Sequence, residues 1–267
     1  MSEILLTFVH ISDTHISQHP SYNTDFGEVT TLVGVKALVK QLNKLPFEPD
    51  FVLHTGDVAY NPDPTAYITC KEILGKIKYP IYYVAGNHDD HISLHENLQQ
   101  SWINPQGKMY FDFELNGVQV IIANTNDPVN YPAGQVTEDQ LEWLSQLCSA
   151  DDNRPLIIAE HHNLLPVGIP WLDTYMRAAN GQDFHNAILP ARDRLRGVFF
   201  GHVHQNLDIE RDGIHYYSTV SSWFQLEGYP GLVESKPDAS AEPGYSIVTI
   251  TKNQTFVRRC RFPLPAS

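Results

Sequence analysis

The sequence predicts an α/β fold in which two mixed β-sheets pack face to face and helices cover the outer faces. Three observations lead to this prediction. Short apolar runs recur along the chain, and each one ends in a polar cluster, which is typical of buried strands followed by functional loops. Helix-length stretches separate the first three runs, and glycine-containing turns join pairs of strand-like segments later in the chain.

The candidate core strands are the apolar runs 5–11, 51–54, 81–85, 156–159 and 198–200. Between the first three, residues 28–45 repeat their apolar positions with helical spacing, and 65–77 form a second helix-length stretch. Thr137 and Gln140 have the spacing of a capping box and predict the start of another helix. Strands that alternate with helices in this way indicate βαβ units and parallel pairing.

Further strands are expected to pair as hairpins. Asn116-Gly117 and Asp212-Gly213 are strong signals for two-residue hairpin turns. A third pair is expected around Asn253. The paired segments are 110–115 with 118–123, 207–211 with 214–218, and the two halves of 245–262.

The organisation along the chain indicates one domain over residues 1–267. No internal repeat or domain boundary stands out. Residues 164–192 contain several prolines and glycines, and we interpret them as an insertion that forms a cap over the site or a dimer contact. Residues 228–243 are expected to form a flexible loop. Apolar residues in 164–176 and in the C-terminal strands are the candidate surface of a homodimer.

Composition excludes several classes of protein. The chain has 267 residues, of which 42% are hydrophobic and 18% charged, as in an ordinary globular domain. Its net charge of −13 disfavours nonspecific binding to nucleic acid. Cys70, Cys148 and Cys260 form neither a disulfide framework nor a zinc motif. Without a signal-like N-terminus or a run of about 18 apolar residues, the protein is expected in the cytoplasm, with no membrane span.

Polar clusters follow five of the apolar runs, and they carry the candidate chemistry. They are Asp13-x-His15, Gly56-Asp57, Gly86-Asn87-His88-Asp89, Glu160-His161-His162 and Gly201-His202-x-His204. Carboxylate and amide oxygens and imidazole nitrogens are ligands of hard and borderline divalent metals. Residues two apart on an extended segment point the same way, so the two side chains of each i, i+2 pair should converge. The sequence therefore predicts a metal centre.

These motifs, in this order, resemble those of the calcineurin-like metallophosphoesterases. The resemblance is to the bacterial branch of class III cyclic-nucleotide phosphodiesterases and glycerophosphodiesterases. It runs from about Phe8 to Ser222 and includes Pro166-Val167-Gly168 and Trp171-Leu172-Asp173. It implies a four-layer αββα sandwich of two mixed sheets flanked by helices.

The resemblance also implies a dinuclear metal centre, with ligands assigned position by position. One metal would be held by Asp13, His15 and His204, the second by Asn87, His162 and His202, and Asp57 would bridge them. The two ions would be divalent or mixed-valence Mn, Fe, Zn or Co, since mixed nitrogen and oxygen ligands do not fix the element. A metal-activated hydroxide would be the nucleophile.

Two further residues would act beside the phosphate. His88 would protonate the leaving oxygen or stabilise charge in the transition state. Asp89 would orient His88 or one of the metal ligands. Phe224 is a candidate for stacking on a nucleobase, although packing in the core explains an aromatic residue there equally well.

The fourth cluster departs from the family pattern. The family usually reads His-x-Pro at this point, whereas His162 is followed here by Asn163 and Leu164. Anchoring on Trp171 favours His162 as the ligand, with His161 as a substrate-side or packing residue.

The function predicted in this way is metal-dependent hydrolysis of a small phosphodiester, either a cyclic nucleotide such as 3′,5′-cAMP or a glycerophosphodiester. The alternative on the same site is a broad phosphomonoesterase or phosphonate-ester hydrolase. A non-catalytic metal-binding protein is less favoured, because no ligand position is missing. Nuclease activity is disfavoured by the net charge and the absence of a basic groove.

Overall fold

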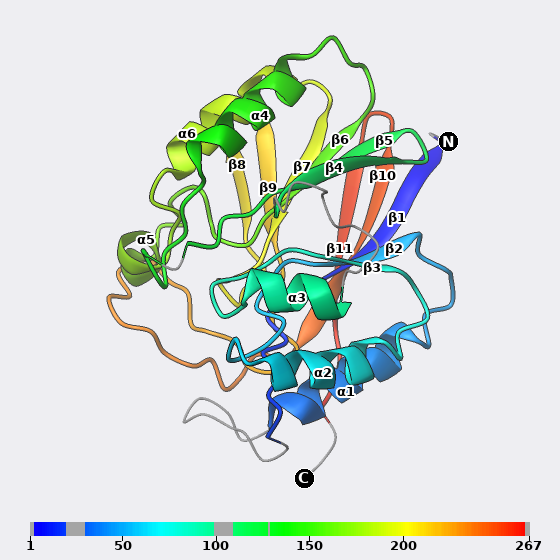
Figure 1. The fold of residues 1–267 in the computed structure, drawn as a ribbon, viewed down its shortest axis with the longest axis vertical. Helices are drawn as coiled ribbons and strands as arrows, with labels where there is room; N and C mark the ends of the chain where they lie inside the picture. The colour runs from blue at the N-terminus through cyan, green and yellow to red at the C-terminus, as the bar shows by residue number, and fades with distance from the viewer. Residues whose placement is uncertain (1–2, 20–29, 99–108, 128, 265–267) are drawn as a thin grey trace.

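The computed structural model describes residues 3–19, 30–98, 109–127 and 129–264 (Figure 1). Eleven strands in these residues form two sheets. The first has the order β11 (Thr255–Arg261), β10 (Gly244–Thr251), β1 (Ile4–Ile11), β2 (Phe51–His54), β3 (Ile81–Tyr83). The second has the order β4 (Phe111–Leu115), β5 (Val118–Ile122), β6 (Leu156–Ala159), β7 (Leu195–Phe200), β9 (Ile214–Ser218), β8 (Asp208–Arg211).

Both sheets are mixed, as predicted. In the first sheet, β1, β2 and β3 are parallel, and the hairpin of β10 and β11 is added antiparallel to β1. In the second, β5, β6, β7 and β9 are parallel, and β4 and β8 are the antiparallel edges. The turns Asn116-Gly117 and Asp212-Gly213 have positive φ at all four residues, as a type I′ hairpin turn requires. The predicted hairpins are therefore confirmed.

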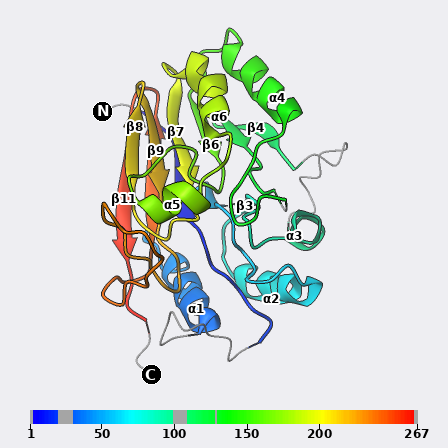
Figure 2. The same cartoon turned by 90° about the vertical axis from the view of Figure 1, so that its left-hand side faces the viewer.

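Two groups of helices cover the sheets (Figures 1 and 2). One group comprises α1 (Thr31–Leu42), α2 (Pro64–Leu74) and α3 (His91–Leu98). The other comprises α4 (Glu138–Ser149), α5 (Pro170–Tyr175), α6 (Gly181–Ile188) and the short 3₁₀ helix η1 (Leu189–Ala191). Among the described residues, no helix is both long and apolar enough to cross a bilayer.

Three hydrophobic cores hold the layers together. Between the sheets, the ring of Phe8 stacks on Phe51 at a centroid distance of 5.0 Å and meets the edge of Phe199 at 5.1 Å. A second core lies between the first sheet and α1 with α2, and a third lies between the second sheet and α4 with α6. Alternate residues of the parallel strands enter different cores, since side chains alternate across a strand. This confirms the predicted αββα layering.

The helix predicted from Thr137 begins there, but not by the expected capping box. Thr137 is the N-cap of α4, yet its side chain makes no capping hydrogen bond. The Gln140 side chain instead donates to the backbone oxygen of Asn124 at 2.7 Å and accepts from its N–H at 2.8 Å. Gln140 therefore fixes the loop after β5 rather than the helix end.

Residues 164–192 contain α5, α6 and η1, none of which the periodicity indicated. Phe184 and Ile188 of α6 are buried in the outer core beside α4. Trp171 and Leu172 of α5 are also buried there. Most of this segment therefore completes the outer helical layer, and a role as cap or dimer contact stays a prediction, as does the division of the chain into one domain. Helix α3 was also not predicted, and the described part of 228–243 contains no helix or named strand.

Candidate metal centre

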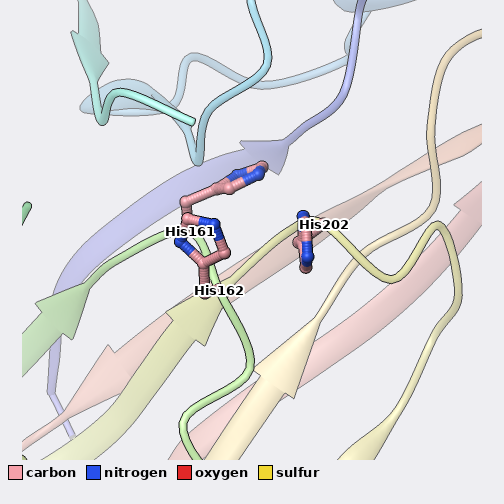
Figure 3. Close-up of side chains that lie close together, drawn as sticks. All are labelled: His161, His162 and His202. Atoms are coloured by element: carbon pink, nitrogen blue, oxygen red, sulfur yellow. The ribbon is translucent and has the colours of Figure 1, made fainter. Parts of the chain in front are cut away.

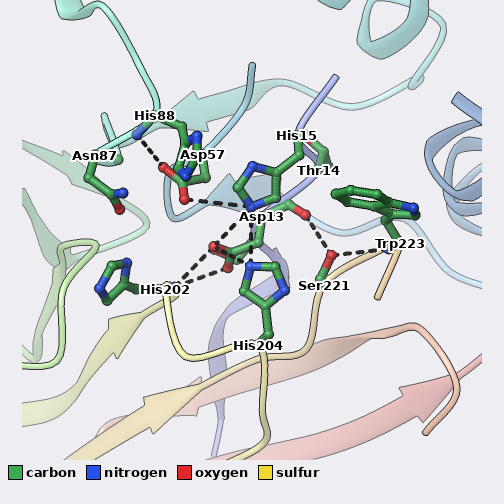
Figure 4. Close-up of polar contacts among 12 residues, drawn as sticks. Asp13, Thr14, His15, Asp57, Asn87, His88, His202, His204, Ser221 and Trp223 are labelled. Atoms are coloured by element: carbon green, nitrogen blue, oxygen red, sulfur yellow. Dashed lines mark hydrogen bonds and ion pairs between the residues drawn. The ribbon is translucent and has the colours of Figure 1, made fainter. Parts of the chain in front are cut away.

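Polar side chains from five loops meet at the edge of the two sheets where β1, β2, β3, β6 and β7 end. Figure 4 shows residues of the loops after β1, β2, β3 and β7, and Figure 3 shows the two histidines after β6. The loops come from both sheets, so residues far apart in the sequence, such as Asp13 and His204, become neighbours. The set includes every predicted ligand and the predicted catalytic histidine. It comprises Asp13, His15, Asp57, Asn87, His88, His161, His162, His202 and His204.

One group of potential ligands comes from the loops after β1 and β7. The Nε2 atoms of His15 and His204 lie 3.1 Å apart. Asp13 Oδ1 is 3.4 Å from His204 Nε2 and 4.0 Å from His15 Nε2. All three side chains are buried, and their ligand atoms lie close enough together to hold one metal ion.

A second group comes from the loops after β3, β6 and β7. His161 Nε2 lies 3.0 Å from the Asn87 side-chain oxygen. The ring of His202 lies 4.9 Å from that of His161 and 4.6 Å from that of His162 (Figure 3). Ligand atoms of the three histidines also lie close enough together to hold an ion.

Asp57 lies between the two groups. Its Oδ2 is 3.6 Å from His15 Nε2, whereas its Oδ1 is 3.4 Å from His161 Nε2. Oδ1 also accepts the backbone N–H of His88 at 2.8 Å. One carboxylate therefore presents one oxygen to each group, as a carboxylate that bridges two ions must do.

The backbone brings these side chains together in an unexpected way. The sequence argument placed each i, i+2 pair on extended chain. Instead, Asp13, His15, Asp57, His202 and His204 all have positive φ, between 43° and 67°. The predicted convergence is correct, but the extended geometry is wrong. Non-glycine residues in this region are strained and cluster at functional sites.

Glycines allow the loops to approach one another. Gly56 precedes Asp57 and has φ 97°, a conformation that glycine adopts readily and that turns the chain sharply. Gly86, in contrast, does not have a positive φ. A Cβ there would collide with the Asp57 carboxylate, so this position needs glycine for space.

Backbone carbonyls orient three of the imidazoles. His161 Nδ1 donates to Thr55 O at 2.6 Å, and His204 Nδ1 donates to Phe224 O at 2.9 Å. His202 Nε2 donates to Met176 O at 2.9 Å. Such bonds fix the ring and leave the other nitrogen of each ring to bind a metal.

The electrostatics fit a cationic occupant. Burial lowers the pKa of His15 and of His202 to about 3, so both are neutral, as a ligand must be. Burial would also lower the pKa of His161, but the neighbouring Asp57 outweighs it and raises that pKa to about 10. Protons on such histidines balance the buried carboxylates, and divalent cations would balance the same charges. The donor set of carboxylate, amide and imidazole groups therefore fits a pair of divalent metals.

The two adjacent histidines after β6 have different surroundings. His161 contacts Asn87 and Asp57, as described above. His162 Nδ1 lies 2.8 Å from the hydroxyl of Thr125, and its Nε2 lies 3.2 Å from the carbonyl oxygen of Pro132. Both ring nitrogens of His162 therefore have protein partners. The structure brings His161 next to Asp57, whereas the sequence favoured His162 as the ligand.

His88 is held at the edge of the centre. Its Nδ1 donates to the backbone oxygen of Tyr60 at 2.8 Å. Its ring meets that of His15 edge-on at 4.8 Å and lines the same pocket as Asp57 and Asn87. The ring is half-buried, and Nδ1 is already bonded, so Nε2 is the nitrogen that remains for substrate.

Asp89 is buried and holds two loops together. Its carboxylate accepts the backbone N–H groups of Val58, Ala59 and Gly86 at 3.0–3.1 Å and the hydroxyl of Tyr67 at 3.1 Å. Burial and the charge of Asp57 raise its pKa to about 6. Asp89 thus fixes the loops that carry Asp57 and Asn87, and its carboxylate bonds these loops and Tyr67 rather than the ring of His88.

Comparison with known proteins identifies the family. The calcineurin-like phosphoesterase family matches residues 6–206. The chain belongs to this family. The resemblance stated from the motifs is therefore confirmed, and with it the prediction of a metallophosphoesterase.

Several curated relatives of this calcineurin-like phosphoesterase are phosphodiesterases by name. A probable cyclic nucleotide phosphodiesterase of Psychrobacter arcticus is 28% identical over 92% of this chain and 89% of its own length. The 3′,5′-cyclic adenosine monophosphate phosphodiesterase CpdA of Escherichia coli (strain K12) is 26% identical over 84% of this chain and 79% of its own length. A probable cyclic nucleotide phosphodiesterase of Psychrobacter sp. (strain PRwf-1) is 30% identical over 78% of this chain, but the match spans only 61% of that relative.

Solved structures confirm the fold of this calcineurin-like phosphoesterase. A dimetal phosphatase from Danio rerio has a TM-score of 0.66 with 14% identity, covering 96% of this chain and 99% of its own. The purple acid phosphatase PPD1 from yellow lupin also has a TM-score of 0.66 with 14% identity, covering 98% of this chain and 52% of its own. These likenesses concern the architecture alone.

Aromatic and apolar residues form one wall of the pocket. Phe224, the predicted stacking residue, lies 4.6 Å from the ring of His204 and lines the pocket with Trp223. Trp171, Met176 and Leu226 extend this wall. Sequence reasoning missed Trp171 and Met176 as cleft residues. The signal for them was the interpretation of 164–192 as a cap over the site or a dimer contact, which named no individual cleft residue.

Proposed function

We propose that this calcineurin-like phosphoesterase hydrolyses small phosphodiesters with two divalent metal ions, and that 3′,5′-cyclic nucleotides are the preferred class. The observation that carries the proposal is the position of Asp57, with one carboxylate oxygen toward each ligand group beside an aromatic pocket. Relatives named as cyclic nucleotide phosphodiesterases support the choice of substrate.

The proposed ligand set differs from the one expected from sequence at one residue. Asp13, His15 and His204 would hold one ion, Asn87, His161 and His202 the other, and Asp57 would bridge. When bound, such ions neutralise charge on the phosphoryl group and lower the pKa of a coordinated water toward neutrality. His161 takes the position proposed earlier for His162 because its Nε2 faces Asp57 and Asn87.

His88 would act on the leaving group. Tyr60 O fixes Nδ1, so the proton that moves is the one on Nε2. His88 would donate this Nε2 proton to the leaving ester oxygen as the bond between that oxygen and phosphorus breaks. Alternatively, the N–H would stabilise the negative charge that develops on the oxygen. Asp89 would keep the loops of Asp57 and Asn87 in register during the reaction.

The pocket favours a diester over a monoester. No Lys or Arg is among the described residues that line it, so the second negative charge of a phosphomonoester would have no cationic side chain there. Trp171, Trp223 and Phe224 line the pocket, and the Phe224 ring meets that of Trp223 edge to face. Stacking of a base on an aromatic side chain contributes about 1–3 kcal/mol. This wall favours a nucleotide over glycerol as one substituent.

The substrate comparison tests the proposal directly. The metal-reconstituted enzyme should hydrolyse bis(4-nitrophenyl) phosphate and 3′,5′-cAMP with higher kcat/KM than 4-nitrophenyl phosphate. Product release, followed by absorbance and by chromatography, measures the three rates. A dominant monoester rate would contradict the proposal and favour the phosphatase alternative.

The two adjacent histidines predict different metal contents. His161→Ala should lose about one of the two ions per chain, because the ligand group of Asn87, His161 and His202 loses the imidazole nitrogen of His161. His162→Ala should retain more metal, because its ring nitrogens face Thr125 and Pro132. Elemental analysis of both variants after dialysis measures the difference, with the exposed His215→Ala as the control. A greater loss in His162→Ala would restore the assignment made from sequence.

His88→Ala should keep its metals and lose rate. General acid–base assistance is typically worth about 10²–10⁴-fold, so kcat should fall by that factor. The measurement pairs steady-state rates on 3′,5′-cAMP with metal content, again against His215→Ala. Loss of metal would make His88 a ligand, and an unchanged kcat would remove it from the chemistry.

A further inference from the structure

Two fully buried histidines lie in the strands that lead into the metal centre, and the proposed mechanism uses neither of them. His10 is in β1, and His54 is the last residue of β2. Burial lowers the pKa of both rings, to about 3 for His54, so each ring is neutral and carries one N–H. A polar ring in a core costs free energy unless it makes a hydrogen bond. An apolar side chain would fill either place at lower cost, so a polar contact is the reason to look for.

Each histidine contacts a threonine in the loop that follows the neighbouring strand. His10 Nε2 lies 2.9 Å from the hydroxyl of Thr55, in the loop after β2. His54 Nε2 lies 2.9 Å from the hydroxyl of Thr14, in the loop after β1. The Thr14 hydroxyl donates its proton to Val58 O at 3.0 Å, so His54 Nε2 is the donor in the second contact. The two contacts are reciprocal, because each strand supplies one histidine and each loop supplies one threonine.

The two contacts lie on opposite faces of the first sheet. His10 faces the core between the sheets, where its ring meets that of Phe199 edge to face at 5.6 Å. His54 faces the core beneath α1 and α2, where its ring lies 5.8 Å from that of Tyr83. Ile11, the partner of His54 in the register of β1 with β2, enters the same core. The loops after β1 and β2 are therefore held together from both sides of the sheet.

Backbone hydrogen bonds join the same two loops between these contacts. The N–H of Asp13 donates to Gly56 O at 3.0 Å, and the N–H of His15 donates to Asp57 O at 2.9 Å. Asp13, His15 and Asp57 have the left-handed backbone described above. Such strained conformations persist only where the surrounding structure holds them. The two histidine contacts supply a restraint of this kind at the place where the strain occurs.

Each threonine is also linked directly to the ligand set. Thr14 stands between Asp13 and His15 in the chain (Figure 4). Thr55 O accepts the Nδ1 proton of His161 at 2.6 Å, which leaves Nε2 of that ring to face the centre. A displacement of either threonine would therefore move a ligand.

We infer that His10 and His54 are positioning residues, which clamp the loops after β1 and β2 in the conformation that the metal ions require. The inference rests on the proposed two-metal function, because it concerns the same ligand groups. Both histidines stay outside the ligand set and act through Thr55 and Thr14. Loss of either contact should relax the left-handed residues and weaken metal binding.

The metal alone is the probe. Co²⁺ is titrated into the metal-free enzyme, since its visible absorption reports both affinity and ligand geometry. His10→Leu and His54→Leu each remove one hydrogen bond and keep the space filled. Loss of a residue that orients metal ligands typically costs about 10–100-fold in affinity, and we expect about tenfold here because the histidines act through a threonine. His10→Gln and His54→Gln keep a polar group near Nε2 and should restore most of the affinity and the absorption spectrum.

The threonines provide the other half of the test. Thr14→Val and Thr55→Val remove the hydroxyl of each contact and should also weaken Co²⁺ binding about tenfold. If a histidine and its threonine act as one unit, Thr14→Val combined with His54→Leu should bind Co²⁺ little more weakly than Thr14→Val alone, and likewise for the other pair. Effects that multiply would show that the two side chains act independently and would contradict the inference.

His185→Leu is the matched control for stability. His185 is equally buried, in α6, and its ring contacts the Tyr216 hydroxyl at 2.6 Å and Asp212 Oδ2 at 3.0 Å, away from the ligand loops. This variant should lower the melting temperature and leave Co²⁺ affinity and spectrum unchanged. Amide hydrogen exchange of the metal-free protein adds a second measurement, because His54→Leu should reduce protection at Asp13 and His15 whereas His185→Leu should not.

The outcomes separate this inference from the proposed function. Weaker Co²⁺ binding that glutamine restores supports the clamp even if no phosphodiester is hydrolysed, an outcome that would overturn only the proposed function. Leucine variants with unaltered Co²⁺ affinity, spectrum and amide exchange would overturn the clamp and leave the phosphodiesterase proposal standing. An equal loss of metal in His185→Leu would overturn it too. If a leucine variant does not fold, the threonine variants decide in the same way.

Discussion

The position of the Asp57 carboxylate is the constraint on which the rest of the site depends. It lies where loops from both sheets converge, with one oxygen toward His15 and the other toward His161. To reach this position, Asp57 adopts φ 52°, and Gly86 leaves room for its carboxylate. Asp89 then bonds the backbone on both sides of this contact, at Val58 and at Gly86. Together these contacts, between residues about 30 positions apart in the sequence, hold the Asp57 carboxylate between the two ligand groups.

This arrangement of buried charges and strained backbone lowers the stability of the folded protein. Buried carboxylates and imidazoles lose their hydration, and strained backbone residues cost on the order of 1–3 kcal/mol each. The three cores that surround the two sheets offset this cost by burying apolar residues on every layer. The stacked rings of Phe8 and Phe51 lie in β1 and β2, the strands that lead into Asp13 and Asp57. Packing between the sheets thereby positions the loops.

Much of the fold could be predicted from the sequence because local chemistry determines it. The turns at Asn116 and Asp212 require residues that tolerate positive φ, and both hairpins form as expected. The polar clusters at strand ends identified the site, since parallel strands in layered α/β folds end at a common edge.

The remaining features depend on contacts that the sequence does not encode locally. His162 differs from His161 because its ring nitrogens contact Thr125 and Pro132. These two residues lie 30 or more positions away along the chain. Gln140 has the spacing of a capping residue, yet it bonds the loop at Asn124. The left-handed backbone of the ligand residues, all of them Asp or His, likewise could not be read from the sequence alone, because these residue types tolerate this conformation but do not require it.

A direct test of the account is the metal content and turnover of Asp57→Asn. Asparagine has the same shape but no charge, so the fold should remain while the link between the two ligand groups is lost. We predict that the purified, metal-reconstituted variant holds at least one ion fewer per chain than the unaltered enzyme and hydrolyses 3′,5′-cAMP far more slowly. The fully exposed Asp193→Asn should match the unaltered enzyme. Two ions and full activity in Asp57→Asn would contradict the bridging role.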